Sequence, residues 1–181
     1  IFLITYHPTT LEDNTSKDHI KNILNVLKGF CSTTLVFTFP NADMYGKIII
    51  SEIEKFTKKN SNAFAYKSLG QSNYYSLLKH ANIIIGNSSS GIIEAPYFAV
   101  PTVNIGERQK GRLKARSTID VKPSEKDILR GINQALEKKF SNLCKKNEYL
   151  YGKSGASKKA YKIIKQRIEK LKLNNKFYDL V

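Results

Sequence analysis

The chain has few of the residues that build disulfide frameworks and metal sites. Its 181 residues include two cysteines, Cys31 and Cys144, and three histidines. The cysteines lie far apart and outside any CxxC or Cys/His ligand spacing, which argues against a disulfide framework and a zinc site. We expect both cysteines to be buried and to act as small hydrophobic residues.

Long apolar runs are also missing. No stretch approaches the roughly 20 apolar residues of a membrane helix, and none has the flanks of a secretion signal. Hydrophobic residues make up 41% and charged residues 25% of the chain, as in ordinary globular proteins. The length suits one domain with its own core. We therefore expect a cytoplasmic protein with no membrane partner.

Acidic residues are half as numerous as basic ones, 15 against 30, and the net charge is +15. The excess is concentrated after residue 137, where 13 lysines and arginines face 3 acidic residues. That region holds KKAYKIIKQRIEKLKLNNKF, which is typical of a helix with a lysine face, either in solvent or against an acidic partner domain. An RNA-binding module is the alternative. No RNA-recognition motif or aromatic ladder supports it, so we expect no nucleic-acid partner.

Strand and helix patterns alternate along the chain. Apolar β-rich runs occupy residues 1–6, 33–39, 63–67, 82–86, 100–105 and 118–121. Helical patterns occupy residues 18–30, 45–59, 72–81, 91–99 and 123–139, the last with Ser124 as its N-cap. The alternation predicts βαβ crossovers, and hence an α/β fold with a Rossmann-like, doubly wound parallel sheet covered by helices on both faces.

The first residues already have a strand pattern. IFLITY begins without a methionine or a polar lead-in. Compact domains seldom begin inside a core strand. We expect the chain to be a piece of a longer protein.

The loops that follow the strands are the candidate binding regions, because ligands of doubly wound sheets lie beyond the carboxyl ends of the strands. Each loop carries hydrogen-bonding groups, and the last adds a dense positive charge. They are His7-Pro8, Pro40 to Asp43, Ser68 to Ser72, GNSSSG at 86–91 and GERQKGR at 106–112. The pattern predicts an elongated, anionic ligand that is rich in hydroxyl groups.

GNSSSG opens a helical pattern directly after an apolar strand. Such a turn leaves backbone N–H groups free, and a helix N-terminus favours an anion. Ser88, Ser89 and Ser90 add hydroxyl donors, so we favour a phosphate site over a turn in which one serine merely caps the helix. The spacing fits neither a Walker loop, nor GxGxxG, nor GxSxG. All three histidines precede the serines, which excludes a hydrolase elbow.

Three further side chains are candidates. Glu94 lies one helical turn after Ser90, where it could accept hydrogen bonds from the hydroxyl groups of a sugar ring or simply stabilise the first turn of the helix. His7 could donate to a phosphate, act as an acid, or be structural. Arg108 begins RQKGRLKAR, and its guanidinium suits phosphate or uracil carbonyl oxygens.

Together these motifs resemble the C-terminal half of the hydrolysing UDP-N-acetylglucosamine 2-epimerases, notably the bacterial sialic-acid-synthesis type. The similarity runs from His7-Pro8 through FPNAD, GNSSSGIIEAP and PTVNIGERQKGR to KKAYKIIKQRIEKL, and so covers essentially the whole chain. The resemblance implies one half of a two-domain GT-B architecture. Residues 1–165 would be the UDP-binding C-terminal domain, and residues 166–181 a helix end and tail that pack on the N-terminal domain.

The resemblance also implies roles for individual residues. His7 would be catalytic and face the diphosphate, and the UDP-binding residues would be Asn41, Ser72, Ser88, Ser89, Ser90, Gly91, Glu94 and Arg108. Glu94 would hold the ribose hydroxyls. Some relatives have a histidine near Ser68-Leu69, which this chain lacks. The implied partners are a UDP-sugar, the N-terminal domain and possible further copies of the protein; no metal or cofactor is implied.

The implied chemistry is anti-elimination of UDP to a 2-acetamidoglucal, followed by hydration to N-acetylmannosamine. The carboxylates that act at C2 would come from the N-terminal domain, so we expect this chain alone to bind UDP weakly without epimerase activity. Three alternatives stay open: an epimerase for UDP-2,4-diacetamido-trideoxyhexose of the legionaminic type, half of a GT-B glycosyltransferase, and a non-catalytic sugar-nucleotide sensor.

Overall fold

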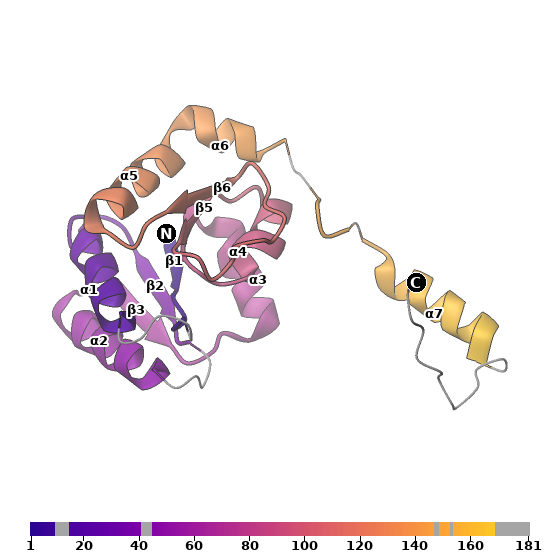
Figure 1. Ribbon diagram of the computed structural model, residues 1–181, viewed down its shortest axis with the longest axis horizontal. Helices are drawn as coiled ribbons and strands as arrows, with labels where there is room; N and C mark the ends of the chain where they lie inside the picture. The colour runs from indigo at the N-terminus through magenta and orange to yellow at the C-terminus, as the bar shows by residue number, and fades with distance from the viewer. Residues whose placement is uncertain (10–14, 41–44, 147–148, 153, 169–181) are drawn as a thin grey trace, which may run out of the picture. The chain divides into compact units, whose positions relative to one another are not determined.

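A parallel sheet of six strands forms the centre of the unit that spans Ile1–Leu150 (Figure 1). The computed structural model describes residues 1–168 apart from 10–14, 41–44, 147, 148 and 153. The strands are β1 (Phe2–Thr5), β2 (Leu35–Thr38), β3 (Ala63–Tyr66), β4 (Ile83–Gly86), β5 (Thr102–Ile105) and β6 (Thr118–Val121). Their order is β3-β2-β1-β4-β5-β6, and every pair is parallel. The predicted strands and fold class are confirmed.

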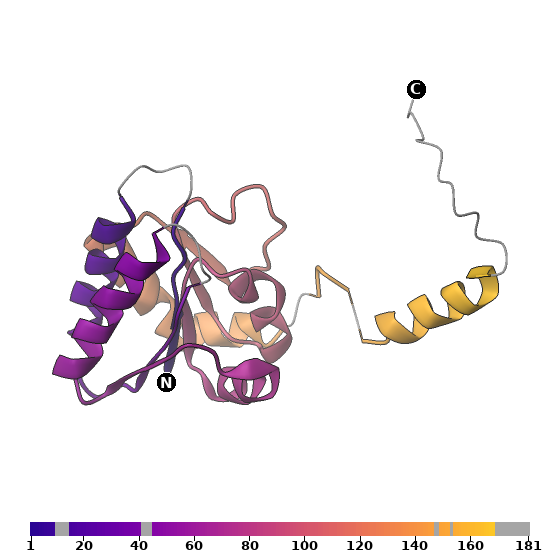
Figure 2. The same cartoon turned by 90° about the horizontal axis from the view of Figure 1, so that it is seen from below.

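Helices cover both faces of this sheet (Figure 2). One face carries α1 (Ser16–Leu27), α2 (Gly46–Lys59) and α5 (Glu125–Leu136), and α6 (Lys138–Cys144) follows α5. The opposite face carries α3 (Gly70–His80), the single turn α4 (Ser90–Ile93) and the 3₁₀ helix η1 (Ala95–Phe98). Helices on both faces are the arrangement expected when parallel strands are joined by crossover helices.

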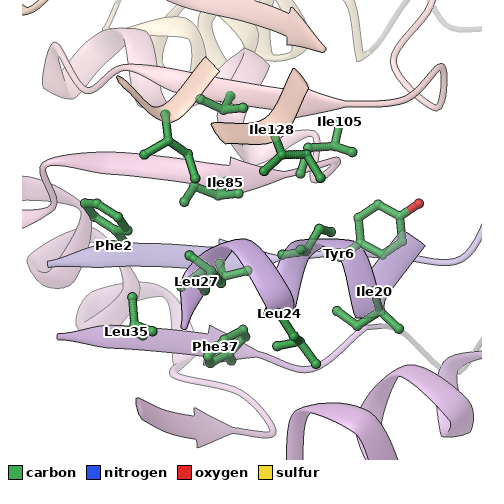
Figure 3. Packing of buried hydrophobic residues seen from close by; sticks show 14 of the residues in the cluster. Phe2, Tyr6, Ile20, Leu24, Leu27, Leu35, Phe37, Ile85, Ile105 and Ile128 are labelled. Carbon is green, nitrogen blue, oxygen red and sulfur yellow. The ribbon is translucent and has the colours of Figure 1, made fainter. Parts of the chain in front are cut away.

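Two apolar clusters hold these layers together. The larger cluster packs Phe2 and Ile4 of β1 against the apolar stripes of α1, α2 and α5. Figure 3 shows Phe2 in this cluster with members from α1 and α5. The smaller cluster packs Leu3, from the other face of the same strand, against Leu78 of α3 and Ala95. Alternate residues of a strand point to opposite faces, so a strand covered on both sides must be apolar throughout. This explains the near-continuous apolar runs of β1 and β4.

The predicted helix over residues 123–139 is divided in two. Ser124 caps α5 as predicted, because its Oγ accepts the Asp127 N–H at 3.2 Å. Glu137 then adopts an extended backbone, with ψ of 135°, and α6 begins. Phe140 and Cys144 would lie roughly 100° or more around a continued α5 from its buried stripe. The break therefore allows both side chains to pack inward.

The two cysteines differ in exposure. Cys144 is 4% exposed, as predicted. Cys31 is exposed, so the prediction for it was wrong. Cys31 lies in the surface turn between α1 and β2, where its thiol donates to the Lys28 carbonyl at 3.2 Å.

The chain divides into two compact units, Ile1–Leu150 and Tyr151–Val181. The second unit contains α7 (Ala156–Arg167), whose side chains, lysines and isoleucines alike, are exposed. Residues 169–181 lie outside the described part, so the predicted division at residue 165 and the packing of the tail stay predictions. Within the described residues, no helix combines the length and apolarity needed to cross a membrane.

Candidate functional site

A pocket of about 480 Å³ lies beyond the carboxyl ends of β1, β2 and β4. The strand order reverses between β1 and β4, and ligands of doubly wound sheets bind beside that point. The pocket is lined by Thr5, His7, Thr38, Phe39, Pro40, Lys67, Ser68, Leu69, Gly70, Gln71, Tyr74, Tyr75, Ser88, Ser90 and Glu94. Four residues singled out from the sequence, His7, Ser88, Ser90 and Glu94, therefore meet in one cavity.

Gly86 lets the end of β4 approach the end of β1. Its φ is +133°, and a Cβ at this position would lie 1.9 Å from the Thr5 carbonyl oxygen. Only glycine adopts this backbone without strain, and any side chain would collide with the neighbouring strand. The close approach brings the serine turn beside His7.

Asn87 joins the loops that follow β1 and β4. Its Oδ1 accepts the His7 N–H at 2.7 Å, and its Nδ2 donates to the His7 carbonyl at 2.8 Å. Its own carbonyl accepts Arg108 Nη1 at 3.0 Å and Gln109 Nε2 at 2.8 Å. Asn87 is 1% exposed; its bonds with His7 and Gln109 are buried, and that with Arg108 is partly buried. The role of Asn87 and Gln109 was not predicted from the sequence, because an asparagine after a strand usually indicates only a turn.

The serine turn differs from the predicted helix start. The predicted helix 91–99 is one α-helical turn followed by η1, because Pro96 has no N–H with which to continue the α-helical ladder. A helix of four residues has a small dipole, so attraction for an anion depends on individual donors. Within the described part of the chain, the N–H groups of Ser88 and Ser89 have no protein acceptor.

Two tyrosines of α3 contact the far side of this turn. The Tyr74 hydroxyl lies 2.6 Å from Ser90 Oγ, and the Tyr75 hydroxyl donates to Glu94 Oε1 at 3.1 Å. Burial raises the pKa of Tyr74 to about 12. The sequence analysis did not single out either tyrosine. The pair of tyrosines just after a strand-end loop was the available signal.

The other predicted site residues lie around the pocket rather than in it. Ser72 is exposed on α3, and Ser89 is the N-cap residue directly before α4. Gly91 is buried, and a Cβ there would lie 2.6 Å from Thr102 Cγ2. Arg108 reaches the turn through its bond to the Asn87 carbonyl. Asn41 lies outside the described residues, and the UDP-binding role of all these residues stays a prediction.

The predicted positive charge after β5 is partly neutralised. Lys110 pairs with Glu107 at 2.8 Å, and Lys114 pairs with Asp120 at 2.8 Å. The hydrogen bond from Lys110 lowers the pKa of Glu107. Exposed pairs of this kind contribute little to stability, because water and salt screen the attraction. In the described ranges, no three His, Cys, Asp or Glu side chains are placed to hold a metal ion.

Two curated proteins are similar in sequence. A Campylobacter jejuni protein named GDP/UDP-N,N'-diacetylbacillosamine 2-epimerase (hydrolyzing) is 42% identical over 148 residues, 81% of this chain and 37% of that protein. The polysialic acid biosynthesis protein P7 of Escherichia coli is 35% identical over 181 residues, 99% of this chain and 46% of that protein. The chain thus spans less than half the length of these relatives.

The fold also occurs in solved structures. The S. aureus MnaA-UDP co-structure matches with a TM-score of 0.72 at 14% identity, over 98% of this chain and 48% of that chain. At this identity the match shows the fold alone, a Rossmann-like half of a GT-B architecture. The model of the family described as UDP-N-acetylglucosamine 2-epimerase matches residues 1–165. On the extent of that match, this chain belongs to the UDP-N-acetylglucosamine 2-epimerase family.

Proposed function

We propose that this chain is the UDP-binding half of a hydrolysing UDP-N-acetylglucosamine 2-epimerase. The whole protein would release UDP and N-acetylmannosamine for sialic acid synthesis. One observation carries the proposal: in a chain of this family, His7, Ser88, Ser90 and Glu94 line one pocket at the point where the strand order reverses. UDP in the S. aureus MnaA co-structure and the name of the E. coli relative support it.

The diphosphate lies against the serine turn in this proposal. The free N–H groups of Ser88 and Ser89 and the hydroxyl of Ser90 donate to its oxygens, with His7 facing it from the end of β1. Donors that are fixed before the reaction stabilise the charge that develops on the leaving group. A carboxylate close to the phosphates would be repelled. Glu94 therefore accepts hydrogen bonds from the ribose hydroxyls.

The reaction removes the proton at C2 of the sugar. The C2–H electrons form the C1–C2 double bond while the C1–O bond breaks, and UDP leaves with the electron pair of that C1–O bond. Water then adds its oxygen to C1, and a proton adds to C2 from the opposite face. Glu94 is the one carboxylate among the described residues that line the pocket. It faces the ribose in this proposal, so the groups that act at C2 come from the N-terminal domain.

Calorimetric titration of the 181-residue chain with UDP tests the proposal. We expect a dissociation constant of about 0.1 to 1 mM, weakened about 10-fold or more by Glu94→Gln and about 5-fold by Ser90→Ala, which removes the proposed hydroxyl donor. Ser76→Ala, on an exposed position of α3, is the matched control and should bind like the parent chain. Absence of UDP binding contradicts the proposal.

An activity assay tests the division of labour between the two halves. The 181-residue chain should release neither UDP nor free amino sugar from UDP-N-acetylglucosamine, whereas the full-length protein should release both. Turnover by the 181-residue chain alone would show that the C2 chemistry does not need the N-terminal domain.

A second candidate substrate is UDP-2,4-diacetamido-trideoxyhexose. The 42% identical relative named for N,N'-diacetylbacillosamine favours it. The full-length protein, incubated with each sugar nucleotide and no acceptor, distinguishes the candidates by which free amino sugar appears. A glycosyltransferase would release little free sugar in the same assay. Retention of RNA at about 0.15 M salt, with UDP binding that falls as salt rises, would instead favour the RNA-binding alternative.

A further inference from the structure

Two neighbouring side chains of α3 contact two functional groups of the pocket. We propose that Tyr75 is a positioning residue that orients Glu94 toward the ribose, and that Tyr74 orients Ser90 toward the diphosphate. This inference rests on the proposed function. It assigns part of the discrimination between ribose and deoxyribose ligands to a phenol of the pocket wall that acts through Glu94.

The contact of Tyr75 fixes one half of the Glu94 carboxylate. Its hydroxyl donates to Oε1 at 3.1 Å, while Oε2 makes no hydrogen bond within the described part of the chain. The Tyr75 ring is itself held, 5.6 Å from the ring of Phe98 and 6.3 Å from that of Tyr74. A donor on a packed ring restricts the rotation of Glu94, and Oε2 remains available to a ligand hydroxyl.

Tyr74 acts on Ser90 in the same way. The two hydroxyl oxygens are 2.6 Å apart. A phenol keeps its proton near neutral pH, all the more because burial raises the pKa of Tyr74 to about 12, so its hydroxyl can donate to Ser90 Oγ. The serine proton is then directed elsewhere, and the pocket that Ser90 lines is where an anion would accept it.

The spacing of the two contacts agrees with a bound nucleotide. Ser90 and Glu94 are about one helical turn apart along the chain, and they meet two successive residues of α3. The phosphate and ribose of one nucleotide are also adjacent groups. In this proposal α3 runs beside the ligand, so that Tyr74 contacts the residue that binds the phosphate and Tyr75 contacts the residue that binds the ribose.

Titration with two ligands separates these roles. Tyr75→Phe and Tyr74→Phe are titrated with UDP and with 2′,3′-dideoxy-UDP, which lacks both ribose hydroxyls. We expect the parent chain to prefer UDP by about 10-fold. Tyr75→Phe should weaken UDP binding about 5-fold and leave the dideoxy ligand unchanged. Tyr74→Phe, the matched control on the adjacent position, should weaken both ligands equally.

A double variant shows whether Tyr75 acts through Glu94. In the Glu94→Gln background, Tyr75→Phe should have no further effect on UDP binding. Equal losses for both ligands in Tyr75→Phe, or a loss that persists in the Glu94→Gln background, would overturn the inference while the proposed function stands. Failure of the parent chain to bind UDP would instead overturn the proposed function. Thermal melting of each variant confirms that the rings still pack.

Discussion

Single residues hold the strand-end loops of this molecule in register. Asn87 uses its side chain to bond the His7 backbone in both directions and its carbonyl to receive two side chains from the loop after β5. Buried polar groups are costly unless they are hydrogen-bonded, so a residue with this many buried bonds is strongly constrained. The proposed phosphate donors follow it directly in sequence, and their positions depend on it.

Replacing Asn87 with aspartate tests this constraint. The carboxylate can still accept the His7 N–H, but it faces the His7 carbonyl with no proton to donate, and its charge is buried. We expect the free energy of unfolding to fall by about 2 to 4 kcal/mol in urea denaturation. Asn133→Asp, on an exposed position of α5, should change it by less than about 0.5 kcal/mol. Similar effects of the two variants would show that the Asn87 bonds contribute little.

At the scale of secondary-structure elements, local signals predicted the ends of some helices correctly. Ser124 has an extended backbone, with ψ of 146°, and its Oγ both accepts from the Asp127 N–H and lies 2.7 Å from Asp127 Oδ2. The hydrogen bonds from Ser124 and Arg130 lower the pKa of Asp127. The cap and the carboxylate belong to a single turn of chain, so sequence spacing alone was enough to predict Ser124 as the N-cap.

Removal of this cap should lower the stability of the protein by about the contribution of one hydrogen bond. We expect Ser124→Ala to lower the free energy of unfolding by about 1 kcal/mol, measured by chemical denaturation. Ser61→Ala, in an exposed turn before β3, is the matched control and should lie within about 0.5 kcal/mol of the parent. A Ser124→Ala variant as stable as the control would contradict the assignment of the cap.

Helix interruptions were harder to predict than caps. At Glu137 the apolar residues stop following the stripe of α5, so a continued helix would point Phe140 and Cys144 away from the core. The change in spacing is visible in the sequence, but it predicts a break only when the position of the core is known. The division at Pro96 was visible in the sequence as well. The short helix has only a small dipole. The proposed attraction for a phosphate therefore depends mainly on the N–H groups of Ser88 and Ser89.

At the scale of the whole molecule, the packing of α6 determines the chemistry of Cys144. The thiol is 4% exposed, near η1 and the segment before β6, and burial raises its pKa to about 11. At pH 8 only about one thiol in a thousand would then be ionised, and the thiolate is the reactive form. Cys31 lies exposed at the surface of the same domain.

Alkylation should therefore distinguish the two thiols. With iodoacetamide at pH 8, we expect Cys31 to react within minutes and Cys144 to stay unmodified until the protein unfolds. Intact mass and peptide mapping measure the extent at each site. A Cys31→Ser variant should show no rapid label when native and one label in denaturant. Equal labelling of both thiols in the native chain would show that α6 opens readily.

The fold class, the six strands, the family and the place of the candidate site at the loops after β1 to β4 could be predicted from the sequence, whereas the predicted loop after β5 does not line the pocket. Those properties follow from periodicity, turn residues and motifs, which are written over a few consecutive positions. Only the tertiary structure placed Asn87 against His7, Tyr75 against Glu94 and Tyr74 against Ser90. These contacts join segments brought together by chain crossovers, and a hydrogen bond depends on distances of tenths of an ångström that no local pattern encodes.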